Sequence, residues 1–245
     1  MILIFNYNLA MMFHFKQFSV DQSGCAMKIN TDGVLLGALA GANKSSAILD
    51  IGTGTGVIAL MLAQRFPIAH IDAVEIDENA AKTATANLQN SRFANRLTLY
   101  SSGFETFFEV HPDKKYDLIV SNPPFYINSL KSPGAKKTLA KHTDEGFFDK
   151  LVHDSAAHLN TNGIFWLILP PETAELVKTL AIKCGLYLQR IIRLHSFEID
   201  TPHREILSWS FAEQQVVEEH LVIYDEPKIY SKQYQAMLKD FLTIF

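Results

Sequence analysis

From residue 47 onward, short apolar runs alternate with longer segments in which apolar residues recur at helical spacing. The runs predict strands at 47–51, 70–74, 96–100, 116–121 and 163–169, and the segments between them predict helices at 57–66, 77–90, 146–159 and 171–184. Two further strands, at 186–195 and 205–211, alternate in polarity and favour an antiparallel edge. This order predicts an α/β fold with a seven-stranded, mostly parallel sheet and helices on both faces.

The β–α alternation also divides the chain. Residues 1–12 are expected to be a disordered leader, residues 13–45 an N-terminal extension, and residues 46–245 the main domain. The long loop at 126–142 has no predicted element, and such loops are usually functional or disordered.

Composition narrows the classes of function. Hydrophobic residues make up 48% of the chain and charged residues 20%, with a formal net charge of −4, so nucleic acid could be bound only through a local basic patch. The two cysteines, Cys25 and Cys184, are far apart, which argues against disulfides and cysteine zinc sites and fits a reducing cytosol. No metal site and no membrane span are expected.

A glycine-rich turn follows the first strand of the main domain. Gly52, Gly54 and Gly56 stand at every second position, where they let the backbone turn tightly and approach a ligand. Dinucleotide binders use a different spacing, and Asp50 would repel a pyrophosphate but suits the cationic amino-acid end of S-adenosylmethionine. Glu75, which ends the second strand, is expected to accept both ribose hydroxyls. The alternative is a plain glycine-rich βα turn.

The motif Asn122-Pro123-Pro124-Phe125 follows the strand at 116–121. The Asn122 side-chain oxygen and a neighbouring carbonyl can both accept hydrogen bonds from one exocyclic amine. The prolines stiffen the corner, and Phe125 offers a flat face to a planar ring. This pattern predicts a receptor for a planar NH2-bearing group; the alternative is an ordinary proline turn.

Together these motifs resemble the class I S-adenosylmethionine-dependent methyltransferases that act on planar amines. Six further segments, at 15–18, 25–29, 31–33, 35–38, 60–65 and 202–204, make the chain similar to the bacterial tRNA (adenine-N6)-methyltransferases that modify position 37 of a valine tRNA. The similarity extends from about Met12 to Phe245. It implies a Rossmann-like fold, S-adenosylmethionine as cofactor and tRNA as substrate. A cytoplasmic monomer is expected.

The resemblance also assigns roles in cofactor binding. The N-terminal extension is expected to close over the cofactor, which makes Lys28, Thr31 and Asp32 candidates for its methionine end. Relatives often carry an acid after the third strand, but Gly103 stands there in this chain. Ser102 or Phe104 is expected to substitute for that acid.

For the substrate, the resemblance implies that Asn122 Oδ1 and the Pro123 carbonyl accept the two N6 hydrogens while Phe125 stacks on the adenine. Basic side chains in the long loop suit RNA phosphates, although a solvated flexible loop would have the same composition. The candidates are Lys131, Lys136, Lys137, Lys141 and His142, with His203 and Arg204 as a second patch.

Three other functions share parts of this pattern. A glutamine N5-methyltransferase of release factors has a similar Asn-Pro-Pro corner, but usually with a larger helical domain before it. A guanine-N2 methyltransferase of ribosomal RNA is a further candidate. A catalytically silent RNA-binding module is disfavoured because Asn122 and the glycine turn are intact.

Overall fold

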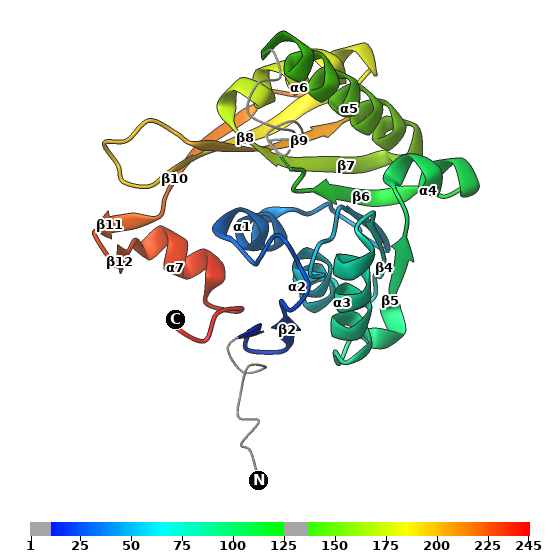
Figure 1. Cartoon of the computed structure of the whole chain (residues 1–245). Coiled ribbons are helices and arrows are strands. Elements are labelled where there is room, and N and C mark those ends of the chain that lie inside the picture. Colours follow the sequence, from blue (N-terminus) through cyan, green and yellow to red (C-terminus); the bar gives the residue numbers. More distant parts are fainter. Residues whose placement is uncertain (1–10, 125–136) are drawn as a thin grey trace.

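A central eight-stranded sheet organises the chain in the strand order β10-β8-β9-β7-β6-β3-β4-β5 (Figure 1). The computed structural model describes residues 11–124 and 137–245, and side chains from residue 146 onward in the second range. The strands are β3 (Ala47–Ile51), β4 (His70–Glu75), β5 (Leu97–Ser101), β6 (Tyr116–Ser121), β7 (Leu159–Leu169), β8 (Tyr187–His195), β9 (Arg204–Ser210) and β10 (Val217–Val222).

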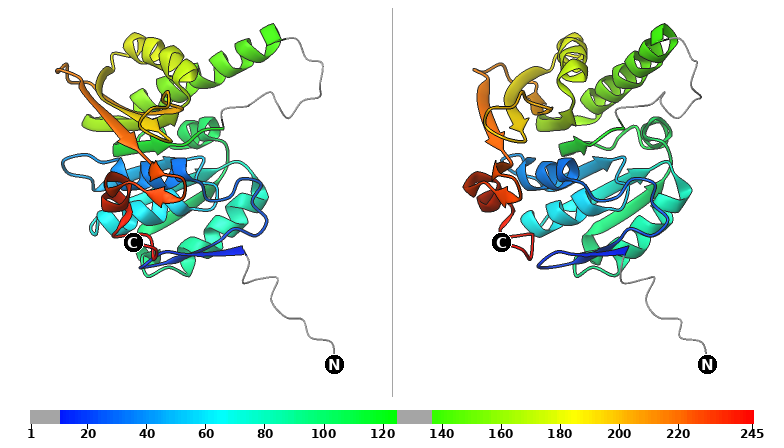
Figure 2. Two further views of the ribbon diagram at one scale, coloured as in Figure 1. Left: turned by 90° about the vertical axis from the view of Figure 1, so that its left-hand side faces the viewer. Right: turned by 60° about the vertical axis from the view of Figure 1, so that its left-hand side comes forward.

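Helices cover both faces of this sheet (Figure 2). One face carries α1 (Thr31–Leu39), α2 (Val57–Arg65), α3 (Glu78–Gln89) and α7 (Lys232–Leu238), and the other carries α4 (Phe104–Val110), α5 (Lys137–His158) and α6 (Pro171–Lys183). The central strands contribute to both layers: in β6, Leu118 and Val120 pack in one hydrophobic cluster and Ile119 in the other. Such double burial explains why β6 is a continuous apolar run.

The strand count and the position of the antiparallel strand differ from the prediction. The sheet has eight strands, because β10 adds to β8 in parallel. The antiparallel strand is β9, which lies between β7 and β8 and not at the edge. The sequence pattern missed β10 because Leu221 is its only fully buried residue, which leaves no apolar run.

The N-terminal extension and the C-terminal residues form smaller elements. A hairpin of β1 (Met12–His14) and β2 (Ser19–Asp21) precedes α1, and β11 (Tyr224–Glu226) pairs with β12 (Ile229–Tyr230) before α7. In Figure 1 the red α7 lies beside the blue α1, so the N-terminal extension and the C-terminal elements meet on one face of the sheet. The prediction of a loop through residue 142 was wrong in its last part, since α5 begins at Lys137.

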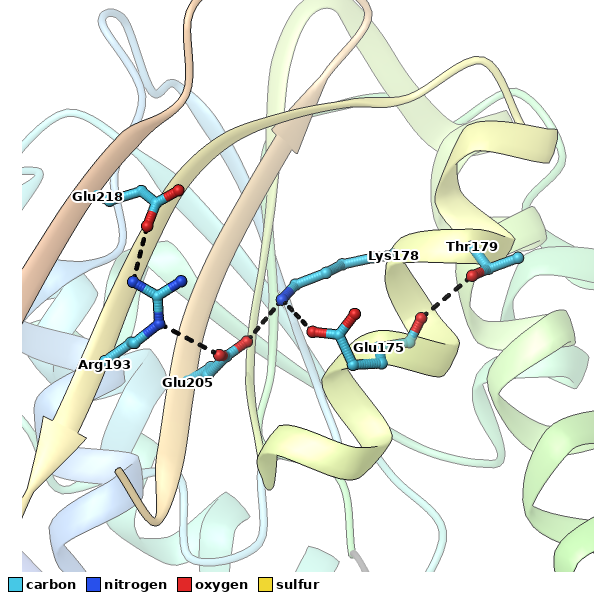
Figure 3. A network of polar contacts seen from close by, with 6 residues as sticks. All are labelled: Glu175, Lys178, Thr179, Arg193, Glu205 and Glu218. Carbon is cyan, nitrogen blue, oxygen red and sulfur yellow. Dashed lines mark hydrogen bonds and ion pairs between the residues drawn. The ribbon is translucent and has the colours of Figure 1, made fainter. Parts of the chain in front are cut away.

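A network of charged side chains ties α6 to the strands β8, β9 and β10 (Figure 3). Its centre is the buried Glu205 of β9, which lies 2.8 Å from Lys178 Nζ and 3.7 Å from Arg193 Nε. Lys178 also pairs with the exposed Glu175 at 2.7 Å, and Arg193 pairs with Glu218 at 2.7 Å. The buried carboxylate therefore has two cationic partners, which offset the cost of its burial.

Candidate functional site

The glycine turn leaves β3 and enters α2 at the carboxyl edge of the sheet. Gly52, Gly54 and Gly56 have φ angles of +71°, +57° and +84°, the left-handed region that side chains disfavour. A Cβ atom added to Gly52 or Gly54 would meet nothing within 4 Å, whereas one on Gly56 would lie 3.1 Å from Leu88 Cδ2. The first two glycines therefore border open space, and the third allows close packing between α2 and α3.

Asp50 lies directly below this turn and is completely buried. Its Oδ2 accepts hydrogen bonds from Thr53 Oγ1 at 2.6 Å and from the Ala59 amide at 3.1 Å, while Oδ1 has no hydrogen-bond partner. Burial, with a smaller contribution from the charge of Glu75, raises the pKa of the Asp50 carboxyl from 3.8 to about 7. A nearby cationic group would favour its ionised form.

Glu75 connects the end of β4 to the glycine turn. It is 8% exposed, and its two carboxylate oxygens accept hydrogen bonds from the Gly54 amide at 2.8 Å and the Asp77 amide at 2.9 Å. A carboxylate has about four acceptor positions, so further hydroxyl donors can still bind. Glu75 therefore fixes the turn and keeps capacity for a ligand.

A cavity of about 370 Å³ opens at this edge of the sheet. Its walls come from the ends of four adjacent strands, β3, β4, β5 and β6, and from the N-terminal extension. The residues predicted from the sequence that line it are Gly52, Gly54, Glu75, Ser102, Phe104, Asn122 and Pro123. The glycine turn and the Asn122-Pro123 corner, 70 residues apart in sequence, thus border one space.

Comparison with known proteins assigns the family. A family model described as the methyltransferase small domain matches residues 29–175. A Pedobacter heparinus protein named tRNA1(Val) (adenine(37)-N6)-methyltransferase is 50% identical, over 95% of this chain and 98% of its own. Proteins of the same name from Flavobacterium psychrophilum and Bacteroides thetaiotaomicron are 43% and 40% identical, each over 94% of this chain and 98% and 96% of their own. This chain belongs to that methyltransferase family.

Solved structures agree on the fold of this methyltransferase. A predicted O-methyltransferase from Agrobacterium tumefaciens matches with a TM-score of 0.65 at 17% identity, over 86% of this chain and 96% of that one. A methyltransferase from Pyrococcus furiosus matches with a TM-score of 0.52 at 24% identity, over 78% and 91%. The fold is therefore that of a Rossmann-like class I methyltransferase, whose methyl donor is S-adenosylmethionine.

The methyltransferase does not bring all the predicted cofactor residues into this cavity. The Lys28 ammonium lies 3.8 Å from Met11 Sδ, Thr31 lines a second hollow, and Asp32 accepts a hydrogen bond from Arg204 Nε at 2.7 Å. Helix α1, which begins at Thr31, nevertheless reaches the Asn122-Pro123 corner, since a Cβ added to Gly33 would lie 3.6 Å from the Asn122 side-chain amide nitrogen.

Sequence reasoning missed part of the cavity wall. Cys25, Ala26 and Met27 line the cavity together with Ile76 and Phe147. Burial raises the pKa of the Cys25 thiol, which keeps it protonated and weakly nucleophilic. Phe147 meets the ring of Phe104 edge to face, with centroids 5.6 Å apart. No sequence signal places them there, because each position depends on contacts between distant elements.

Two side chains of α3 bond to the residues just before Cys25 and so hold the cavity-lining segment in place. The Asn87 carboxamide donates to the carbonyls of Asp21 and Thr55 at 2.8 and 2.9 Å, and accepts from the Asp21 amide at 2.8 Å. The Thr83 hydroxyl donates to the Ser23 carbonyl at 2.7 Å. The extension is therefore bonded to the same helix that packs against the glycine turn.

The candidate RNA-binding residues are only partly described. Phe125, Lys131 and Lys136 lie outside the described residues, and of Lys137, Lys141 and His142 only the helical backbone of α5 is described. Arg204 donates a hydrogen bond to Asp32. The pKa of His203 is lowered by burial and by the charge of Arg204, which leaves that imidazole neutral at pH 7.

Neither a metal cluster nor a membrane helix occurs in the described part of this methyltransferase. Among the described residues, no group of three or more histidine, cysteine, aspartate or glutamate side chains could hold a metal ion. None of the helices in residues 11–124 and 137–245 is long and apolar enough to cross a bilayer.

Proposed function

We propose that this methyltransferase transfers a methyl group from S-adenosylmethionine to the N6 amine of adenine 37 in tRNA1(Val), the reaction for which its relatives are named. The supporting observation is the single cavity that the glycine turn and the Asn122-Pro123 corner share. An amine held at the corner would lie beside a methyl donor held at the turn. Positioning of this kind supplies much of the acceleration of a group transfer.

The residues at the turn fit the cofactor. The open space beside Gly52 and Gly54 lets the amino-acid end of S-adenosylmethionine approach the backbone closely. The acceptor capacity of Glu75 suits the ribose hydroxyls. Asp50 does not line the cavity, so its buried carboxylate below the turn would act on the cationic end only through the turn. When bound, S-adenosylmethionine supplies a methyl group on a positively charged sulfonium, which is already an activated leaving group.

The corner fits the amine. The N6 lone pair of adenine is conjugated with the ring, so the nitrogen is a weak nucleophile. Asn122 Oδ1 and the Pro123 carbonyl would each accept one N6 hydrogen, which favours the tetrahedral nitrogen of the transition state. Phe125 is proposed to stack on the adenine, which must first leave the stack of the anticodon loop. The proton leaves after transfer, so no strong base is required.

Other parts of the chain are assigned by the same proposal. Residues 13–45 form one wall over the cofactor, and residues 46–245 form the methyltransferase domain. Lys28, Thr31 and Asp32 are proposed to reach the methionine end of the cofactor through a rearrangement of α1 and the residues before it on binding. The basic residues from 131 to 142, with Arg204, are proposed to contact tRNA phosphates. The protein is proposed to act as a cytoplasmic monomer.

The experiment is methyl transfer from labelled cofactor to separated substrates. Label in N6-methyladenosine of tRNA supports the proposal, whereas label in release factor or in guanine of ribosomal RNA would establish a rival reaction. Asn122→Ala is expected to reduce transfer at least about 100-fold while cofactor affinity stays within a few-fold. The exposed Asn90→Ala serves as the matched control. Full activity of Asn122→Ala would refute the mechanism.

A further inference from the structure

A second hollow, of about 300 Å³, lies where the N-terminal extension meets the C-terminal residues beside helix α1. Phe13 of β1 lines it together with Asn30 and Thr31 at the start of α1, and Tyr230 and Tyr234 from the C-terminal part. This volume is at the lower end of the range of small-ligand pockets and suits one planar heterocycle. It shares no lining residue with the cavity that the glycine turn and the Asn122-Pro123 corner border.

The lining combines aromatic surface with hydrogen-bonding groups. Tyr230 stacks on Tyr234, with ring centroids 5.1 Å apart and planes 10° apart, so this side of the hollow is rigid. Burial, with the neighbouring tyrosines, raises the pKa of Tyr234 to about 12, so its hydroxyl is neutral. Phe13 is 36% exposed, and Asn30 and Thr31 add polar atoms. An exposed aromatic face beside polar groups is the chemistry that recognises unstacked nucleobases. Phe13 supplies that face here, since Tyr230 is already stacked on Tyr224 and Tyr234.

The position of the hollow relative to the substrate corner indicates which base it would take. Thr31 borders the hollow, and Gly33, two residues further along the same helical turn, approaches Asn122. The two places are therefore separated by about the 10 Å diameter of a helix. A short extended stretch of single-stranded RNA can span that distance.

We infer that this hollow binds a nucleobase next to the methylated adenine, an inference that rests on the proposed function. Extruding the target adenine removes a stacking partner from its neighbours. A neighbour that enters the hollow regains aromatic contact and fixes the extruded adenine at Asn122. The second hollow is thus a specificity site for single-stranded RNA beside the reaction centre.

The test compares Phe13→Ala with Met12→Ala. The two side chains are equally exposed, at 36% and 37%, and adjacent on β1, but only Phe13 lines the hollow. RNA binding is measured with an anticodon stem-loop, together with stem-loops that are abasic on either side of the target adenine. Phe13→Ala is expected to weaken binding of the intact RNA roughly 5- to 100-fold, as loss of one base–aromatic stack does. Phe13→Trp and Met12→Ala are expected to retain affinity.

Two further readouts make the result decisive. On the RNA that is abasic at the bound neighbour, Phe13→Ala should bind with the same affinity as the wild type. Thr243→Trp, which fills the hollow from its exposed wall, should weaken binding of the intact RNA as Phe13→Ala does, with unchanged cofactor affinity. The inference is overturned if Phe13→Ala binds intact RNA like Met12→Ala, or weakens intact and abasic RNAs equally. If wild-type protein methylates no tRNA, the proposed function itself has failed.

Discussion

The buried Asp50 should make the free protein less stable as the pH rises toward neutrality. Its carboxyl is fully buried, has one oxygen without a partner, and has a pKa raised to about 7 by burial. Between its unfolded pKa of 3.8 and about 7, the folded state binds a proton that the unfolded state has released. Stability contributed by this group is therefore present at low pH and is lost as the pH rises through about 7.

The size of the effect follows from the two pKa values. One pKa unit corresponds to about 1.4 kcal/mol, so linkage between pH 5 and pH 8 lowers the free energy of unfolding by about 3 kcal/mol. Asp50→Asn removes the titration and can keep both hydrogen bonds, from Thr53 and Ala59, on its amide oxygen. The variant is expected to gain about 3 kcal/mol of unfolding free energy on the wild type between pH 5 and pH 8.

Urea denaturation at pH 5, 6, 7 and 8 without cofactor measures this difference. All other titrating groups are common to both proteins and cancel in the comparison, so only the divergence of the two curves matters. Curves that stay parallel across this range would show that Asp50 does not titrate near neutral pH in the folded protein. A wild type that gains on the variant with rising pH would reverse the sign of the reasoning.

Two predictions concern packing and buried charge. A Cβ on Gly37 would lie 2.8 Å from Met61 Sδ and 3.1 Å from Met61 Cβ. Gly37→Ala should therefore lower the free energy of unfolding, measured by urea denaturation, by about 1–3 kcal/mol. An unchanged urea midpoint would show that α1 and α2 can separate freely. Lys178→Met should lower the free energy of unfolding by about 1–3 kcal/mol, because it leaves the buried Glu205 without its closest cation. The control Glu175→Gln changes an exposed partner of Lys178 and should lower it by less than about 1 kcal/mol. Equal losses in the two variants would contradict this prediction.

Elements with signals inside their own sequence were predicted closely. The strand at 47–51 matches β3, and the helix predicted at 77–90 matches α3, which Asp77 caps with Oδ1 accepting from the Ala80 amide at 2.8 Å. Pro171 opens α6 and Gly185, with a φ of +74°, follows its end. These features depend on local backbone preferences, which a sequence states directly.

Elements whose place depends on distant partners were not predicted. Strand β10 is held by β8 and by the contact of Arg193 with Glu218, and most of its side chains are solvated, so its pattern resembles a loop. Helix α1 begins at an Asn30 cap but is apolar on nearly every side, which hides its helical period. The resemblance predicted that residues 13–45 close over the cofactor. It did not predict that Cys25, Ala26 and Met27 are the residues of this segment that line the cavity.

That wall is fixed by folding before any ligand enters. Asn87 is buried and makes three hydrogen bonds that join Asp21 to the Thr55 carbonyl of the glycine turn, and an unmade bond of this kind costs about 1–3 kcal/mol. At the other end of the segment, the Asn30 side chain caps α1, whose first turn lies beside Asn122. The two anchors therefore adjoin the glycine turn and the Asn122 corner, the places proposed for the cofactor and the amine. The conformational entropy of the wall is lost on folding, so under the proposed function binding energy remains for aligning amine and methyl group.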